Sequence, residues 1–146
     1  MKSKQKILKK NSDLKSQLGE KILRSLPDWF GIESAIIDYI KDVRAMETWS
    51  VVVDNEEIGF LSVNKHNSST AEIHVMGILP SFHGQSIGTN LVQIVEQDLF
   101  AQGFKFLTVK TLSDSRPNKE YDLTRKFYLR SGFLPLEEFK TLYSWQ

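Results

Sequence analysis

The sequence predicts one α/β domain, with a mixed but mostly antiparallel central sheet flanked by about four helices. Three observations predict this fold. Apolar residues recur every four positions from Leu14 to Leu26, as on one face of a helix. Between Thr48 and Leu79, β-branched and aromatic segments alternate with short polar turns. A strand, a helix and a strand then follow one another within 70–111, which requires a right-handed crossover and a parallel strand pair.

The composition limits the class of protein. A chain of 146 residues can bury one core, so residues 1–146 are expected to form a single domain. The formal net charge of +1 provides no global field for nucleic acid. The chain has no cysteine, which excludes disulfides, thiol nucleophiles and thiolate metal sites and fits a cytoplasmic protein. No signal peptide or membrane span is evident, and three scattered histidines predict no metal site.

The first third of the chain predicts a strand and two helices. Residues 5–10 fit a short strand around Ile7 and Leu8. The polar residues that follow offer N-cap chemistry for the first helix: Asn11, Ser12 and Asp13. Pro27 ends that helix. A second helix begins near Glu33 and is expected to bury an apolar face, formed by Ile36, Ile37, Ile40 and Val43.

The middle of the chain predicts a three-stranded meander and a long helix. The expected strands are 48–53, 58–63 and 70–79, joined by turns at 54–57 and 67–69. The long helix runs over 86–102 and stops at Gly103.

The last third predicts a strand, a loop and a helix. Residues 104–111 are apolar on both faces, which predicts a central strand. A polar loop at 113–119 leads to a helix over 122–131 that Gly132 closes, and 133–143 is expected to be extended.

The segment 71–92 is the most informative part of the sequence. It predicts a strand, a short loop with glycine, and the first turn of a helix. Such an arrangement directs unpaired backbone N–H groups and the positive end of the helix dipole at one place. The sequence therefore predicts a site for a phosphate or pyrophosphate group.

Two motifs resemble the GNAT superfamily, the acetyl-coenzyme A-dependent N-acetyltransferases. After a strand that ends in Ile78-Leu79-Pro80, the first motif reads His83-Gly84-Gln85-Ser86-Ile87-Gly88. The second reads Thr124-Arg125-Lys126-Phe127-Tyr128-Leu129-Arg130-Ser131-Gly132-Phe133. The first motif departs from the family pattern twice, with His83 in place of Arg or Gln and Ser86 in place of Gly.

The resemblance implies that acetyl-CoA is the co-substrate, that no metal takes part, and that a splayed fourth and fifth strand hold the pantetheine arm. The main chain of Met76, Gly77 and Ile78 would bond that arm, and Gly77 suits a bulge. The resemblance also implies a wider set of cofactor contacts, which comprises His83, Gly84, Gln85, Ser86, Ile87, Gly88, Thr89, Tyr121 and Phe127.

The implied reaction is direct attack of a primary amine on the thioester through a tetrahedral intermediate. Tyr128 is the expected acid, at the position where family members aim a hydroxyl at the sulfur. Glu72 is the expected base. His74 either replaces Glu72 or works beside it through water, and strand alternation is expected to place both on one face with Met76.

The acceptor is expected to be a small-molecule or peptide amine bound at the loop between the first two helices. The candidate residues there are Asp28, Trp29, Phe30 and Glu33. The two aromatics alternatively form a plug over the core. Two other functions stay open: a non-catalytic coenzyme A sensor, and a toxin-like aminoacyl-tRNA acetyltransferase. Family members usually have one more strand after the one starting at Phe133, and its absence would invite a homodimer.

Overall fold

A computed structural model of the chain describes residues 5–11, 13–111 and 119–136. The described strands form one sheet in the order β1-β2-β3-β4-β5. They are β1 (Gln5–Lys10), β2 (Glu47–Val53), β3 (Glu56–Lys65), β4 (Thr70–Ile78) and β5 (Phe106–Val109). The helices are α1 (Lys15–Arg24), α2 (Glu33–Ala45), α3 (Ile87–Ala101) and α4 (Lys119–Arg130), with a 3-10 turn, η1 (Pro80–Phe82).

The strand pairing confirms the predicted mixed α/β fold. The pairs β1–β2, β2–β3 and β3–β4 are antiparallel, and β4 and β5 are parallel across the α3 crossover. The chain divides into two compact units, one ending at Val109 and the other beginning at Lys110. The first unit contains the sheet with α1, α2 and α3, and the second contains α4.

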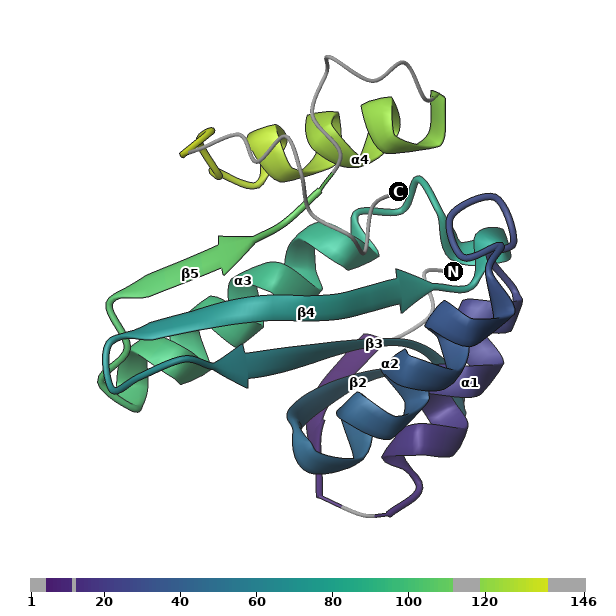
Figure 1. The fold of residues 1–146 in the computed structure, drawn as a ribbon, viewed down its shortest axis with the longest axis horizontal. Helices are drawn as coiled ribbons and strands as arrows, with labels where there is room; N and C mark the ends of the chain where they lie inside the picture. Colours follow the sequence, from purple (N-terminus) through teal and green to yellow (C-terminus); the bar gives the residue numbers. More distant parts are fainter. Residues whose placement is uncertain (1–4, 12, 112–118, 137–146) are drawn as a thin grey trace. The chain divides into compact units, whose positions relative to one another are not determined.

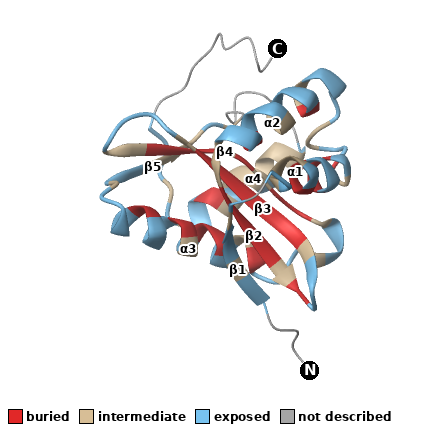
Figure 2. Cartoon of the chain, turned by 90° about the horizontal axis from the view of Figure 1, so that it is seen from below, coloured by how far each residue is buried: buried red, intermediate tan, exposed pale blue. Residues whose placement is uncertain are grey.

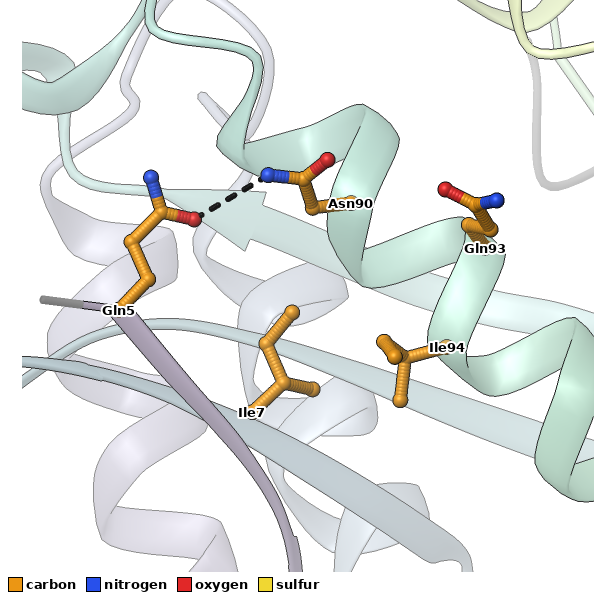
Figure 3. A pocket seen from close by; sticks show the side chains of 5 residues that line it. All are labelled: Gln5, Ile7, Asn90, Gln93 and Ile94. Atoms are coloured by element: carbon orange, nitrogen blue, oxygen red, sulfur yellow. Dashed lines mark hydrogen bonds between the residues drawn. The ribbon is translucent and has the colours of Figure 1, made fainter.

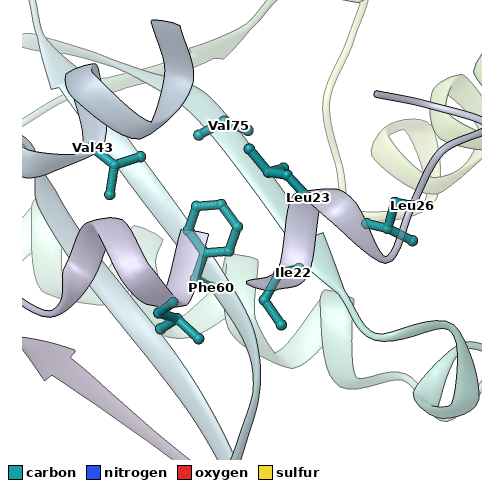
Figure 4. Packing of buried hydrophobic residues seen from close by; sticks show 7 residues of the cluster. Ile22, Leu23, Leu26, Val43, Phe60 and Val75 are labelled. Carbon is teal, nitrogen blue, oxygen red and sulfur yellow. The ribbon is translucent and has the colours of Figure 1, made fainter. Parts of the chain in front are cut away.

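In the first unit, α1 and α2 cover one face of the sheet and α3 covers the other (Figure 1). Phe60 of β3 is fully buried among apolar side chains of α1 and α2, as Figure 4 shows. On the opposite face, the indole N–H of Trp49 donates to Asp98 of α3 at 2.7 Å. The central strands are therefore buried, while the helices expose their outer sides (Figure 2).

Two details differ from the sequence-based expectations for the helices. Leu14, with helical dihedrals (φ −73°, ψ −3°), holds the N-cap position of α1, so neither Asn11 nor Asp13 does, and the third candidate, Ser12, lies outside the described residues. Ile37 is 45% exposed because it lies on the outer side of α2, whereas Ile36 and Val43 are buried. In the described part of the chain, no helix combines the length and apolar character that crossing a membrane requires.

The predicted central position of the last strand stays a prediction, because most of the segment that could pair beyond it, 137–143, lies outside the described residues. The strand β5 is shorter than expected and lies at the end of the strand order. Phe106 is 63% exposed, and no residue of β5 is buried. The loop predicted at 113–119 lies largely outside the described residues, as do the last residues of the extended segment predicted at 133–143.

A hollow of about 380 Å³ lies between β1 and α3. Its lining is made of Gln5, Ile7, Asn90, Gln93 and Ile94. The Asn90 amide donates to Gln5 at 3.3 Å across the hollow (Figure 3). This hollow is at the β1 edge of the sheet, whereas the residues singled out by the sequence lie along β4 and the loop after it.

Candidate active site

A β-bulge interrupts the pairing of β3 with β4 at His74. Ser62 lies opposite Val75 and Val63 lies opposite Ile73, so His74 is the extra residue on β4. A bulge adds one residue to one strand and shifts the alternation of its side chains beyond that point. The predicted bulge in this strand is therefore present, but at His74 and not at Gly77.

The bulge changes which side chains share a face of the sheet. His74 bonds Asp42 of α2, and Val75 packs into the cluster formed by α1 and α2, so both point to that face. Met76 instead pairs with Leu61, on the side of the sheet that faces α3. The prediction that Met76 shares a face with Glu72 and His74 is wrong, because the alternation shifts between them.

Gly77 pairs regularly with Phe60, so a bulge does not explain why this residue is glycine. A Cβ on this residue would lie 2.8 Å from Ile22 Cγ2 and 3.0 Å from Leu26 Cδ1. Glycine therefore allows α1 to pack directly on the backbone of β4.

The strands β4 and β5 separate after a short paired section. Their pairs run from Thr70 opposite Phe106 to Ile73 opposite Val109. The strand β4 continues to Ile78, and along this second section the described residues provide no strand partner at its outer edge. The two strands visibly diverge in Figure 1. The predicted splay of the fourth and fifth strands is therefore confirmed.

The phase of the hydrogen bonds shows which main-chain groups face the splayed edge. The N–H of Leu79 donates to the carbonyl of Ile58 at 2.8 Å, so Leu79 bonds β3. Alternation then turns Gly77 toward β3, and turns Met76 and Ile78 toward the open edge. The geometry favours Met76 and Ile78 over Gly77 as main-chain partners for a molecule in the gap.

His83 lies between the splayed edge and the loop before α2. Its Nε2 atom is 2.7 Å from the carbonyl oxygen of Ile78. Because a carbonyl only accepts, this ring nitrogen carries the hydrogen and donates it. The ring also meets Trp29 edge-on, with 6.0 Å between centroids. The side chain of His83 is therefore directed to protein groups, and its predicted cofactor contact stays a prediction.

The loop between η1 and α3 has an unusual backbone. Gly84 (φ +79°) and Ser86 (φ +62°) are both left-handed, and Gln85 between them is not. The first helical bond runs from Asn90 N–H to the carbonyl of Ser86 at 3.1 Å. Within the described chain, six consecutive N–H groups donate to no protein acceptor: those of Gly84, Gln85, Ser86, Ile87, Gly88 and Thr89. We call these six residues the amide loop.

The geometry of the amide loop explains the sequence of the first motif. Alternating left-handed and right-handed residues turn successive N–H groups toward one concave point that attracts anions. A left-handed conformation costs about 1–2 kcal/mol for a residue with a Cβ, so glycine is favoured at both positions. Ser86 adopts this conformation without being glycine, which makes it a strained position in this chain.

Two histidine–carboxylate pairs lie on the face of β4 that α2 covers. His66 Nε2 is 2.6 Å from Glu72 Oε1, and His74 Nε2 is 2.9 Å from Asp42 Oδ2. The Tyr39 ring meets His74 at 5.4 Å between centroids. Burial, together with the negative charges of Asp42 and Glu72, raises the pKa of the Tyr39 hydroxyl. The side chain of Glu72 is only 8% exposed, so its carboxylate depends on such partners.

The aromatic loop between α1 and α2 supports the plug interpretation. Trp29 and Phe30 are partly buried and pack against the cluster of α1, α2 and the sheet. Phe30 also meets Tyr39 edge-on at 5.8 Å between centroids. Both aromatics therefore close the core. Trp29 also contacts the ring of His83, and Phe30 contacts the ring of Tyr39.

The two carboxylates near this loop differ in their partners. Glu33 accepts two hydrogen bonds of 2.8 Å from the guanidinium of Arg24, which lowers the pKa of Glu33. Its charge is thus already matched, which makes it a poor site for an ammonium group. Asp28 is exposed, with no charged partner among the described residues, so the candidate acceptor role fits Asp28 better than Glu33.

The helix α4 carries the predicted acid and belongs to the second unit. Tyr128 is buried and packs edge-on against Phe127 and Phe133, at 5.1 and 5.3 Å between centroids. Burial, assisted by Tyr121, raises the pKa of the Tyr128 hydroxyl well above its ordinary value. This phenol therefore holds its proton throughout the neutral range.

Three residues of the site were missed by sequence reasoning: His66, Asp42 and Tyr39. Two signals could have found them. A tight turn after β3 brings the residue before it close to the start of β4, which places His66 beside Glu72. Tyr39 and Asp42 are three residues apart on a predicted helix, so they share one face.

Comparison with known proteins finds a matching family. The family model described as "Acetyltransferase (GNAT) family" matches residues 17–133, which is most of the chain. The chain therefore belongs to the acetyltransferase (GNAT) family. No curated protein matches the chain in sequence.

Solved structures share the fold at low sequence identity. An aminoglycoside N-acetyltransferase, AAC(6')-Iy, in complex with CoA aligns with a TM-score of 0.72 and 16% identity, over 97% of this chain and 95% of the other. A GNAT-family protein from Desulfovibrio desulfuricans aligns with a TM-score of 0.76 and 15% identity, over 92% and 87%. The aminoglycoside 6'-N-acetyltransferase AAC(6')-Ih from Acinetobacter baumannii gives 0.66 and 16%, over 95% and 97%.

Family membership defines the class of reaction. The protein is an acetyl-CoA-dependent acyltransferase, and acetyl-CoA is the acyl donor. The fold comparisons are below 25% identity and identify no acceptor for this chain.

Proposed function

We propose that this protein transfers the acetyl group of acetyl-CoA directly to the primary amine of a small molecule. The observation that carries the proposal is the amide loop, whose six unpaired N–H groups lie directly after the splayed section of β4. A diphosphate is an acceptor that satisfies several such groups at once, and the N-terminus of α3 adds its dipole. The residues present therefore fit coenzyme A.

The open edge of β4 offers main-chain groups to the rest of the co-substrate. The main chain of Met76 and the N–H of Ile78 face the gap at this edge and would bond an extended pantetheine arm as a neighbouring strand would, while the Ile78 carbonyl accepts from His83. When bound, acetyl-CoA supplies the thioester that the amine attacks. Because the chain has no cysteine, transfer without a thiol-bound enzyme intermediate is the simplest route.

Glu72 is the proposed base. An amine arrives protonated at neutral pH and must lose a proton before it attacks. The Glu72 carboxylate is anchored through one oxygen by His66, and lies one residue before the last β4–β5 pair. His74, paired with Asp42, is the neighbouring candidate on the same face. Their separate replacement by glutamine decides between them.

Tyr128 is the proposed acid for the departing sulfur. Its raised pKa keeps the hydroxyl protonated at neutral pH, as proton donation requires. The second motif of the family places the tyrosine at this position of α4.

The chemistry around Glu72 supports a cationic small-molecule acceptor. Asp42 and Glu72 provide negative charge there, and Tyr39 and Phe30 provide aromatic surface. Ammonium groups favour this combination. The aminoglycoside N-acetyltransferases of the same fold act on small-molecule amines, in agreement with this acceptor class. A tRNA substrate would need basic groups where the described chain has carboxylates.

The test is thiol release from acetyl-CoA with a panel of small-molecule amines, peptides and aminoacyl-tRNA. We expect release with one or more small amines, and coenzyme A binding in calorimetry without any acceptor. Binding without release for every acceptor would show a coenzyme A sensor. Absence of binding would remove the amide loop as the cofactor site.

A further inference from the structure

The side chain of His83 bridges the connection between β4 and the amide loop. Residues 79–83 form this connection, which contains the turn η1. The imidazole donates from Nε2 to the carbonyl of Ile78, the last residue of β4, over 2.7 Å. The next residue along the chain is Gly84, the first of the amide loop. One hydrogen bond therefore joins the end of the open strand edge to the start of the amide loop.

The backbone of this connection is fixed by bonds that do not involve the imidazole. The N–H of Leu79 donates to the carbonyl of Ile58 on β3 at 2.8 Å. Within the turn, the N–H of His83 donates to the carbonyl of Pro80 at 3.1 Å, and the proline ring restricts φ where the turn begins. A change of the His83 side chain should therefore keep the turn and remove only the contacts of the ring.

The aromatic loop between α1 and α2 contacts the same imidazole. Trp29 meets the His83 ring edge-on, with 6.0 Å between centroids and 82° between the ring planes. Trp29 in turn packs against the buried cluster of α1, α2 and the sheet. Because the ring has a polar contact at one nitrogen and an aromatic contact at its side, few orientations are left to it. Its donor therefore stays directed at Ile78.

The carbonyl that accepts this bond lies on the open edge of β4. Since Leu79 bonds β3, the N–H and the carbonyl of Ile78 face the opposite way, toward the splayed edge. Among the described strands, β3 is the only partner of β4 beyond Ile73. His83 thus takes the last carbonyl of this edge as its acceptor. The Ile78 N–H and the main chain of Met76 are then the groups that the edge offers for strand-like bonding.

We propose that His83 is a positioning residue for acetyl-CoA, in that its bond to the Ile78 carbonyl holds the open edge of β4 and the amide loop in one relative arrangement. This inference rests on the proposed function, in which the pantetheine arm lies along the edge and the diphosphate lies on the amide loop. A ligand that touches both parts binds tightly only when they are held at the spacing that it needs. A ligand that touches the amide loop alone gains nothing from the bond.

The test compares the affinities of coenzyme A and ADP for the wild type and His83→Ala. Coenzyme A spans both parts, whereas ADP offers its diphosphate to the amide loop alone. Calorimetry measures the first affinity, and titrations of backbone N–H signals in NMR spectra measure the second, because such shifts follow weak binding. His83→Ala removes the donor, and we expect coenzyme A affinity to fall about fivefold, as for the loss of one neutral hydrogen bond, with ADP affinity unchanged.

His83→Gln and His83→Asn form a matched pair. The side-chain nitrogen of glutamine is separated from Cα by as many bonds as Nε2 of histidine, so His83→Gln keeps a donor within reach of Ile78 and should restore most of the affinity. Asparagine carries the same amide one bond nearer to the backbone, so His83→Asn should behave like His83→Ala. Ser81→Ala truncates an exposed side chain of the same turn and should bind coenzyme A as the wild type does.

The outcomes separate this inference from the proposed function. A wild type that binds coenzyme A with an affinity that His83→Ala leaves unchanged overturns the positioning role alone. Equal losses for coenzyme A and ADP also overturn it, because the imidazole would then act on the diphosphate or on the amide loop itself. Equal affinities of His83→Gln and His83→Asn overturn it too, since the reach of the donor would then be irrelevant. A wild type that binds no coenzyme A, or whose amide-loop signals do not respond to ADP, overturns the proposed cofactor site and this inference with it.

Discussion

The two sections of β4 differ in their neighbours. Residues 70–73 pair with β3 on one side and β5 on the other, and they include the buried Glu72. Residues 75–78 pair with β3 on one side and with no other described strand, and lead through η1 into the amide loop. The bulge at His74 separates the two sections. One strand thus provides a paired section suited to proton transfer and an open section suited to binding coenzyme A. Variants in either section should therefore affect one property and spare the other.

Gly88→Asp should have the largest effect, in the amide loop that follows the open section. It places a carboxylate in the first turn of α3, where the amide loop would meet the diphosphate. We expect coenzyme A affinity to fall at least about 100-fold by charge repulsion and loss of the N–H approach. Calorimetry measures this. Gln93→Asp adds the same charge to an exposed position of α3 and serves as the control. Equal affinities for the two variants would place the cofactor elsewhere.

Glu72→Gln tests the paired section. We expect kcat to fall about 100-fold, as for the loss of a general base, with coenzyme A affinity within a factor of about two. Stopped assays across pH measure the rate, and calorimetry measures the affinity. If the rate survives and His74→Gln is the slow variant, the base is the His74–Asp42 pair. A parallel loss of coenzyme A affinity would break the division between the sections.

Tyr128→Phe tests the acid, which lies outside both sections. We expect kcat to fall about tenfold with unchanged coenzyme A affinity. The raised pKa of Tyr128 also predicts a stability effect. Its protonated form is favoured in the fold, so stability is full below the unfolded pKa near 10 and declines as pH rises above it. Urea titrations at alkaline pH should show this decline in the wild type and less of it in Tyr128→Phe.

Ser86→Gly should have the smallest effect, a gain in stability. The substitution removes the Cβ that strains the left-handed backbone of residue 86, but it also raises the conformational entropy of the unfolded chain. We expect the free energy of unfolding to rise by about 0.5 kcal/mol. Urea unfolding measures this gain. Ser81→Gly, in the turn η1 without a left-handed backbone, is the control and should lose stability. A loss in both variants would mean that Ser86 contributes more through its hydroxyl than it costs in strain.

Much of the fold could be predicted because local sequence patterns determine most of its helices and strands. The four-residue spacing predicts α1, and the polar turns predict the meander of β2, β3 and β4. The bulge at His74 could not be predicted in place, because no glycine marks it and the pairing of His74 with Asp42 is a tertiary contact. The place of β5 at the end of the described strand order could not be predicted either, because an apolar pattern does not count neighbouring strands.

The candidate site was predictable where a motif fixes the backbone. Gly84 and Gly88 predicted the amide loop, and the resemblance of the two motifs to the family implied the splay. Partners on other elements were not predictable from spacing. Arg24 matches the charge of Glu33, and His66 anchors Glu72, through contacts that exist only in the folded chain.

The chain contains no cysteine, and this has a practical consequence. Each turnover would liberate a thiol, and a chromogenic disulfide reagent would react with that product alone and leave the enzyme unlabelled. The same property makes the chain a clean background for spin labels or fluorophores. One engineered cysteine on α3 and another on α4 would measure the separation of the two units, with and without the nucleotide thioester.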